Sequence, residues 1–388
     1  MNAAAGQIGF PRRVRVCFFN NWAAGLEEAA AYVDRVAHLD LAPHVPDPRD
    51  PAILRLARLD CDWYAENARC FASLRHPEVE FLPAWTVGRN SLLELAKRPP
   101  ETGVERWLIT IGHQPGLLGP AAGRAFGLLR RYGVRHLLYG YDEVSRQLPV
   151  FAEIAPHLDV LVHDELPLAP SASSRLGPGC RTIHRSWVAN VRPFAEPFVE
   201  SPGRRLLFLG SQMGLTPHRK RQIDFLREHL GDRFVAIHDH SVPVADRHRL
   251  AAGFTASLCP EGRKFTTPAM SSSHTDRPFW SGCLGLVPVA EDSRAGGRLE
   301  ELHRAGLIRR YPHGDLPALL ETCRRALEAT ADERRRIHEH FNVRETVGAV
   351  VADAIAAAAP ECGGASSDDP LAAVGAVPSA RGRGSMAE

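Results

Sequence analysis

The chain has 388 residues, of which 47 are Lys or Arg and 45 are Asp or Glu, so its net charge is only +2. A balance this close to neutral argues against a nucleic-acid binder, which needs a concentrated basic face. A hydrophobic content of 44% with 24% charged residues indicates a globular protein, and the length suits two domains.

In the first half, apolar strands alternate with helices and end in polar residues. Strands are predicted at residues 12–21, 105–113, 134–144 and 158–165, and helices at 26–39 and 121–133, the latter closed by Gly133. Strand, helix and strand in succession, with polar residues after each strand, are typical of a parallel α/β sheet.

The second half repeats this pattern. Strands are predicted at 201–212, 232–239, 254–261 and 286–289, and helices at 216–231, 277–285 and 316–341. We therefore predict an α/β protein with two Rossmann-like domains that face each other across a cleft. The expected boundaries are an N-terminal acceptor domain at 1–195, a donor domain at 196–345, and a last helix with a disordered Gly/Ser/Ala-rich tail at 346–388. Ligands of such sheets lie at the carboxyl ends of the strands.

A basic helix start follows the strand that begins the second half. In "GSQMGLTPHRKR", Gly210 and Ser211 end the strand, and Thr216 caps a helix with Pro at its first position. Positive charge in the first turn, which includes Arg219 and Lys220, opposes the helix dipole unless an anion binds there. This predicts a phosphate site, with an exposed basic face as the alternative. The Walker spacing GxxxxGK[ST] is absent.

The next two strand ends add an acid and an arginine. Glu261 in "SLCPEGRK" is placed to accept hydrogen bonds from ribose hydroxyls, or alternatively to pair with Arg263 or Lys264 on the surface. In "SSHTDRPFWSGCLGLVPVAED" Thr275 or Asp276 can cap a short helix that carries Arg277 at its start and ends at Gly285. Hydroxyl acceptors and phosphate donors at successive strand ends are what a nucleotide-sugar requires.

These residues resemble the donor domain of glycosyltransferases with the GT-B fold. The segment "TDRPFWSGCLGLVPV" is similar in spacing to the TEK-x-F-x5-G-x-VPV segment of α1,3-fucosyltransferases, and "SLCPEG" to their FEN strand end. In exostosin-like and CgeB-like transferases the corresponding segment has a similar GC-x-PV ending. The resemblance covers about residues 204–330. Two departures leave the donor and the stereochemistry open. Asp276-Arg277 replaces the Glu-Lys pair of the fucosyltransferases, and Ser281 stands where the Glu-x7-Glu pattern of many retaining relatives has its second acid.

The resemblance implies transfer of a sugar from a nucleoside diphosphate. Fixed positive groups of the protein would stabilise the negative charge of the departing diphosphate, and no metal would be needed. The implied donor-binding residues are Gly210, Ser211, Arg219, Lys220, Arg263, His274, Thr275, Asp276 and Gly285. The implied catalytic residues are Arg277 and Glu261 together with a base from the first domain, taken from His113, Asp142, Glu143 and Asp164. Asn20, Asn21 and Trp22 are predicted to contact the acceptor. The triplet "HDH" at 238–240 offers too few ligands for a metal site.

Two other functions stay open, a nucleotide-sugar 2-epimerase and a non-catalytic nucleotide- or carbohydrate-binding module. A Rossmann dehydrogenase is disfavoured because GxGxxG is absent. The expected partners are the nucleotide-sugar, which is a co-substrate and not a cofactor, and a carbohydrate or other hydroxyl acceptor. No segment of about 20 apolar residues and no signal peptide is found, and the eight cysteines lack a CxxC pair. We therefore expect a cytoplasmic protein, with peripheral membrane contact left open.

Overall fold

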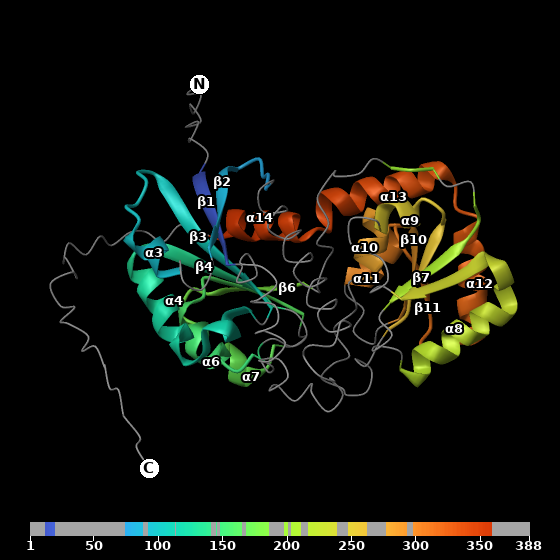
Figure 1. Ribbon diagram of the computed structural model, residues 1–388, viewed down its shortest axis with the longest axis horizontal. Coiled ribbons are helices and arrows are strands. Elements are labelled where there is room, and N and C mark those ends of the chain that lie inside the picture. Colours follow the sequence, from blue (N-terminus) through green and yellow to red (C-terminus); the bar gives the residue numbers. More distant parts are fainter. Residues whose placement is uncertain are drawn as a thin grey trace, which may run out of the picture. The chain divides into compact units, whose positions relative to one another are not determined.

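The chain contains two parallel β-sheets, each with its own helices (Figure 1). The computed structural model describes residues 12–19, 74–87, 92–112, 114–140, 145, 148–164, 168–185, 198–200, 203–210, 216–238, 247–261, 277–292 and 298–358. Together the two sheets form two Rossmann-like α/β domains, which confirms the predicted fold class. How the two domains face each other stays a prediction. No helix in these ranges is both long and apolar enough to cross a bilayer.

The first sheet has six strands in the order β2-β1-β3-β4-β5-β6, and all its pairings are parallel. The strands are β1 (Arg12–Phe19), β2 (Val79–Val87), β3 (Val104–Ile111), β4 (Val134–Tyr139), β5 (Val160–His163) and β6 (Arg181–His184). Four of them confirm the predicted strands, while β2 and β6 were not predicted. The predicted helix at 26–39 lies outside the described residues.

Strand β2 contains Pro83, which explains why the sequence pattern missed it. Proline cannot donate to a strand ladder and is therefore confined to edge strands and bulges. The strand is at the edge of the sheet, and its register with β1 shifts between Arg15 and Cys17, opposite the segment that holds Pro83. The Pro83 carbonyl accepts a hydrogen bond from Arg15 Nη1 at 2.8 Å. The irregular register with β1 therefore lets the sheet accommodate Pro83.

Helices of the first domain cover one face of this sheet. They are α3 (Leu92–Lys97), α4 (Ala122–Arg131), α6 (Phe151–Ile154) and α7 (Pro170–Ser173), with 3₁₀ turns at Gln114–Ala121 and Ala155–His157. Side chains of these helices and alternate strand residues form one buried apolar cluster that includes Leu108, Phe126 and Leu138. Helix α4 confirms the prediction for 121–133.

The second sheet has five parallel strands in the order β11-β10-β9-β7-β8. The strands are β7 (Leu206–Gly210), β8 (Phe234–His238), β9 (Ala256–Cys259), β10 (Val287–Glu291) and β11 (Arg309–Tyr311). Its helices are α8 (Pro217–Leu230), α9 (Arg247–Ala251), α10 (Arg277–Cys283), α11 (Arg298–Arg304), α12 (Leu316–Leu327) and α13 (Ala331–Arg344), with a 3₁₀ turn at Gly231–Arg233. Helix α8 packs against α12, and α10 packs against α13 (Figure 1).

The long helix predicted at 316–341 is wrong, because the chain forms two helices there. Helix α12 ends at Leu327, and α13 begins at Ala331. Thr330 has an extended backbone, and its hydroxyl accepts a hydrogen bond from the Glu333 amide at 3.2 Å. This N-cap satisfies a backbone donor that a continuous helix would pair internally, so the break costs little.

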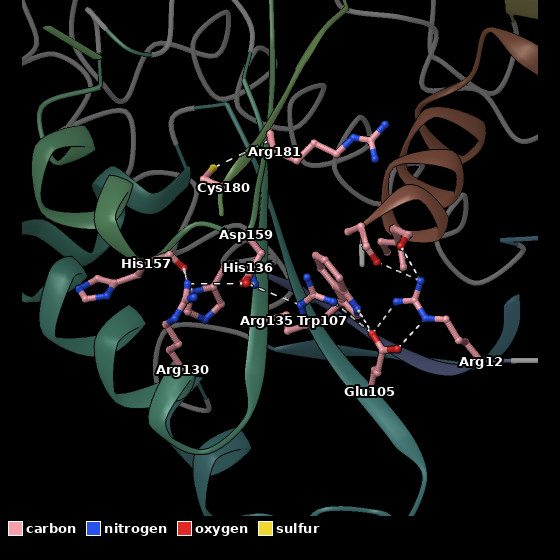
Figure 2. Close-up of polar contacts among 12 residues, drawn as sticks. Arg12, Glu105, Trp107, Arg130, Arg135, His136, His157, Asp159, Cys180 and Arg181 are labelled. Carbon is pink, nitrogen blue, oxygen red and sulfur yellow. Dashed lines mark hydrogen bonds and ion pairs between the residues drawn. The ribbon is translucent and has the colours of Figure 1, made fainter. Parts of the chain in front are cut away.

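The last helix, α14 (Val347–Ala357), is bound at its carboxyl end by arginines of the first sheet. Arg12 Nη1 donates to the carbonyls of Ile355, Ala356 and Ala358 at 3.3, 3.1 and 3.1 Å (Figure 2). The same guanidinium forms a two-point ion pair with Glu105, at 2.7 Å for each contact. A cation at this helix end satisfies carbonyls that have no partner within the helix.

Arg12→Ala should therefore lower the free energy of unfolding by about 1–3 kcal/mol. The loss arises because Glu105 and the end of α14 both lose their donor. Urea denaturation would measure the change, and amide exchange would locate it in α14. Arg13→Ala is the matched control, because Arg13 is the next residue of the same strand and makes an ion pair with Glu80 in which both side chains are about half exposed. A loss no larger than that of the control would contradict this role.

His136 of β4 is fully buried and neutral in the first sheet. Its Nδ1 lies 3.0 Å from the His157 carbonyl (Figure 2). Its ring meets Phe126 edge-on at 4.7 Å between centroids. Burial lowers the pKa of His136 from 6.5 to about 3, because a charged imidazole there would lose its hydration.

This depressed pKa makes stability fall in acid. Below about pH 6.5 the unfolded chain binds a proton at His136 that the folded chain rejects, so the free energy of unfolding drops by up to about 1.4 kcal/mol per pH unit down to about pH 3. His136→Asn retains a donor for the His157 carbonyl and lacks this titration. Urea denaturation between pH 7 and 4 should show the wild type losing its advantage over the variant. A difference that is constant with pH would contradict the prediction.

Candidate functional site

The strand order of the second sheet points to one edge as the ligand site. Strand β7 has β8 on one side and β9 on the other, so the chain reverses direction across the sheet between β7 and β9. Doubly wound sheets bind ligands outside the carboxyl ends of the strands at such a switch point. Here those ends are Gly210 and the segment after Cys259.

Arg277 is hydrogen-bonded to the carboxyl end of β7. Its Nε donates to the Leu209 carbonyl at 3.3 Å, and its guanidinium carbon lies 5.8 Å from the centre of the Phe208 ring. No described residue binds its two terminal nitrogens. Gly210 is required at this strand end because a Cβ there would lie 2.5 Å from the Phe208 ring.

Glu261 follows β9 and is held by its main chain from two sides. Its carbonyl accepts from Arg219 Nε at 3.1 Å, and its amide donates to Glu291 Oε2 at 3.0 Å. Both Glu261 and Arg219 are buried. The structure therefore joins the start of α8 to the end of β9, as the predicted donor site requires.

In the first turn of α8, some polar side chains face the strand ends and others face solvent. Thr216 caps the helix by accepting from the Arg219 amide at 3.3 Å, and Pro217 is its first residue, as predicted. His218 and Arg219 contact the ends of β10 and β9. Lys220 is exposed and forms an ion pair with Asp224 at 2.8 Å. Of Arg219 and Lys220, the two first-turn cations predicted for the donor site, Arg219 is the one that contacts the strand end.

Glu291, the last residue of β10, is a functional candidate that the sequence reasoning missed. Its side chain is fully buried and contacts three other parts of the domain, namely α8, the end of β9 and the turn after β11. The partners are His218, Gln222, the Glu261 amide, His313 and the Gly314 amide. An acid at the end of an apolar strand was the available signal, together with the Pro-His-Gly turn after the next strand.

Gly285 lies apart from Gly210 and Arg219, the described donor candidates at the carboxyl ends of the strands. It follows α10, and its φ of +72° together with the bond from its amide to the Gly282 carbonyl ends that helix, as predicted. The helix begins at Arg277, on the carboxyl side of the sheet, and runs to the opposite side, where β10 begins. The described role of Gly285 is therefore structural.

The remaining predicted residues lie outside the described ranges, apart from Asp164. Asp164 is buried directly after β5. Strand β1 precedes the candidates Asn20, Asn21 and Trp22, and β3 precedes His113. The two strands are neighbours in the first sheet, one on each side of its switch point. The residues outside the description are Asn20, Asn21, Trp22, His113, Asp142, Glu143, Ser211, Arg263, His274, Thr275 and Asp276, as well as Asp239 and His240 of the HDH triplet.

The described site combines two guanidinium groups, a capped helix start and two buried carboxylates. Guanidinium groups and the free amides of a helix start both favour phosphate. Carboxylates beside them can accept hydrogen bonds from sugar hydroxyls. The arrangement is therefore chemically suited to a ligand that carries phosphate and hydroxyl groups together.

Comparison with known proteins gives structural likeness only. No family model matches the chain, and no curated protein matches it. Anabaena HepE, solved in complex with UDP and glucose, is 10% identical over 88% of this chain and 98% of its own, with a TM-score of 0.46. The lipopolysaccharide outer core galactosyltransferase WaaB is 12% identical over 89% and 98%, with a TM-score of 0.42. A mutant O-GlcNAc transferase of Thermobaculum terrenum is 13% identical over 89% of this chain and 66% of its own, with a TM-score of 0.40. Scores this low assign no activity to this chain.

Proposed function

We propose that this protein is a GT-B-type glycosyltransferase that moves a sugar from a nucleoside-diphosphate sugar to an acceptor hydroxyl. The observation that carries the proposal is the placement of Arg277, Arg219 and Glu261 at the carboxyl ends of two neighbouring strands, β7 and β9. Two hydrogen bonds hold the arginines there, from Arg277 to the Leu209 carbonyl and from Arg219 to the Glu261 carbonyl. The switch point of a doubly wound sheet is where such ligands bind.

Arg277 has the role of the main charge-stabilising group in this proposal. When the bond between the sugar and the diphosphate breaks, negative charge grows on the departing phosphate. A guanidinium that is already held in place stabilises that charge without reorganisation. Arg219 and the amides at the start of α8 add further positive potential. The transfer step then needs no metal ion.

Glu261 has the role of holding hydroxyl groups of the donor. Its main chain is fixed at both the amide and the carbonyl, so the direction of its side chain is set before the donor arrives. Fixed geometry of this kind reduces the entropy cost of binding. Asp276 and His274 complete the donor site in this proposal, and the acceptor base comes from the candidates that follow the strands of the first sheet.

Thermal unfolding with a panel of nucleoside diphosphates and their sugars, without added metal, tests the donor site. A ligand at 100 times its Kd should add about 2.7 kcal/mol of stability. The shift should be lost in Arg277→Ala and weakened in Glu261→Gln. Arg227→Ala is the control, because Arg227 is an exposed arginine of α8 that pairs only with Asp224 among the described residues. No shift with any nucleotide at millimolar concentration would overturn the proposal.

Product analysis then separates the transferase from the two other functions. Transfer to an acceptor is expected for the proposed enzyme. Conversion of the nucleotide-sugar alone would indicate an epimerase or hydrolase. Tight binding without turnover of any kind would indicate a binding module.

A further inference from the structure

An unusual number of nitrogen atoms converges on one buried oxygen of the second domain, Glu291 Oε1. His218 Nε2 lies at 2.7 Å, His313 Nδ1 at 2.9 Å, Gln222 Nε2 at 2.9 Å and the Gly314 amide at 3.1 Å. The other carboxylate oxygen accepts from the Glu261 amide at 3.0 Å. The three side chains and two amides come from α8, the turn after β11 and the end of β9.

Two of these nitrogens are donors whose orientation is fixed. The Gly314 amide belongs to the main chain. The amide of Gln222 is oriented because its oxygen accepts from the Tyr311 hydroxyl at 3.0 Å, so its nitrogen faces Glu291. These two donors already give Oε1 the hydrogen bonds that a buried carboxylate oxygen needs, while its negative charge still attracts a cation. Hydrogen bonding to Glu291 alone therefore does not require the two imidazoles.

Charge gives a second reason to look for a cation. A carboxylate removed from water is costly unless an opposite charge lies beside it. The two imidazole rings are stacked with centroids 4.5 Å apart, and each has a nitrogen within 2.9 Å of Glu291 Oε1. One ion bound by both rings and the carboxylate would supply the opposite charge.

We propose that His218, His313 and Glu291 bind a divalent transition-metal ion, for which zinc is the probe. The three ligand atoms, Nε2, Nδ1 and Oε1, all lie within 4.8 Å of one another. Two imidazoles and one carboxylate form a ligand set that zinc accepts, with a fourth position for water. The sequence patterns predicted no metal here, because the three ligands are 22 to 95 residues apart along the chain.

The surroundings fit such a site. The side chains of His218 and His313 are 29% and 40% exposed, which gives an ion and its water a route from solvent, while Glu291 is fully buried. Gln222 and the Gly314 amide would orient the ligating carboxylate by hydrogen bonding, as outer partners of metal sites do. Tetrahedral zinc keeps its ligand atoms about 3.3 Å apart, so each nitrogen would move away from Oε1 by about 0.5 Å.

The ion would order the carboxyl edge of the second sheet without taking part in sugar transfer. Its ligands join α8, β10 and the turn before α12, and Glu291 continues the connection to the Glu261 amide. The metal site does not depend on the proposed transferase activity. The two hypotheses can therefore fail separately.

Zinc titration of the chelator-treated full chain tests the site. The wild type should bind one equivalent of zinc that is lost, or weakened by more than about 100-fold, in His218→Ala and in His313→Ala. His229→Ala is the control, because His229 is exposed on the same helix and bonds only to the Phe225 carbonyl among the described residues. Cobalt in place of zinc should give the visible absorption of a tetrahedral site, and the same two variants should abolish it.

The histidine variants should fold, because both side chains reach solvent, and circular dichroism would check this. If the double variant His218→Ala, His313→Ala binds zinc as the wild type does, or if the wild type binds none, the cluster is a hydrogen-bonded one and the proposal is overturned. Nucleotide-dependent unfolding measured on the same samples reports on the transferase proposal alone.

Discussion

Replacing Arg277 by alanine should lower the rate of sugar transfer by about 10²–10³-fold, the usual cost of removing a fixed group that stabilises charge in the transition state. The guanidinium is held against the Leu209 carbonyl by Nε, and no described residue binds its terminal nitrogens. The loss should appear mainly in kcat, because the charge on the diphosphate grows as the sugar departs. Steady-state kinetics with the donor identified by thermal unfolding would measure it.

Arg277→Lys is the matched variant, since it keeps the charge and loses the planar two-point geometry. It should recover part of the activity that alanine removes. Arg227→Ala should leave the kinetics unchanged. If alanine at position 277 raises KM and leaves kcat as it was, Arg277 binds the donor without stabilising the transition state, and its assigned role is wrong.

Replacing Glu291 by alanine should have the largest effect on stability, with a loss of about 3–5 kcal/mol in the free energy of unfolding. The carboxylate is the acceptor for two main-chain amides, those of Glu261 and Gly314, and for the Gln222 side chain. Each buried donor that loses its acceptor costs about 1–3 kcal/mol. Urea denaturation in the presence of a chelator measures the effect of the side chain without any contribution from bound metal.

Glu291→Gln provides the comparison, because it keeps the shape and one acceptor oxygen but turns an acceptor into a donor. Its loss should be smaller than that of alanine and larger than that of Glu321→Ala, a change at an exposed residue of α12. A loss of less than 1 kcal/mol in Glu291→Ala, with the chelator present, would show that these elements do not depend on the carboxylate.

Much of the secondary structure was predictable from local patterns. Strands β1, β3, β4 and β5 and the five-residue strand β7 are runs of apolar residues, and α8 has a Thr-Pro start and a Gly end. These features depend on neighbours within a few residues, so a pattern can reveal them. The strand with Pro83 and the break before Thr330 were missed, because a partner strand decides the first and a capping hydroxyl the second.

The donor site stays a prediction, and the structure shows how the elements that carry its described residues are connected. Polar residues after β7 and β9 and at the start of α10 were identified in the sequence, and the structure brings Arg219 to Glu261 and Arg277 to Leu209. It also turns Lys220 toward Asp224. Which residue of a basic turn points inward depends on the packing of the helix, which the spacing of charges does not specify.

The sequence by itself determined that this chain forms two parallel α/β units with polar and charged side chains after their strands, because burial patterns and caps are local properties. Only the tertiary structure decided that β7 and β9 are neighbours, and that Glu291 joins residues as distant as His218 and His313. Parallel strands pair across long connections, so their order has no local signature. A buried carboxylate acquires its partners only when those strands come together.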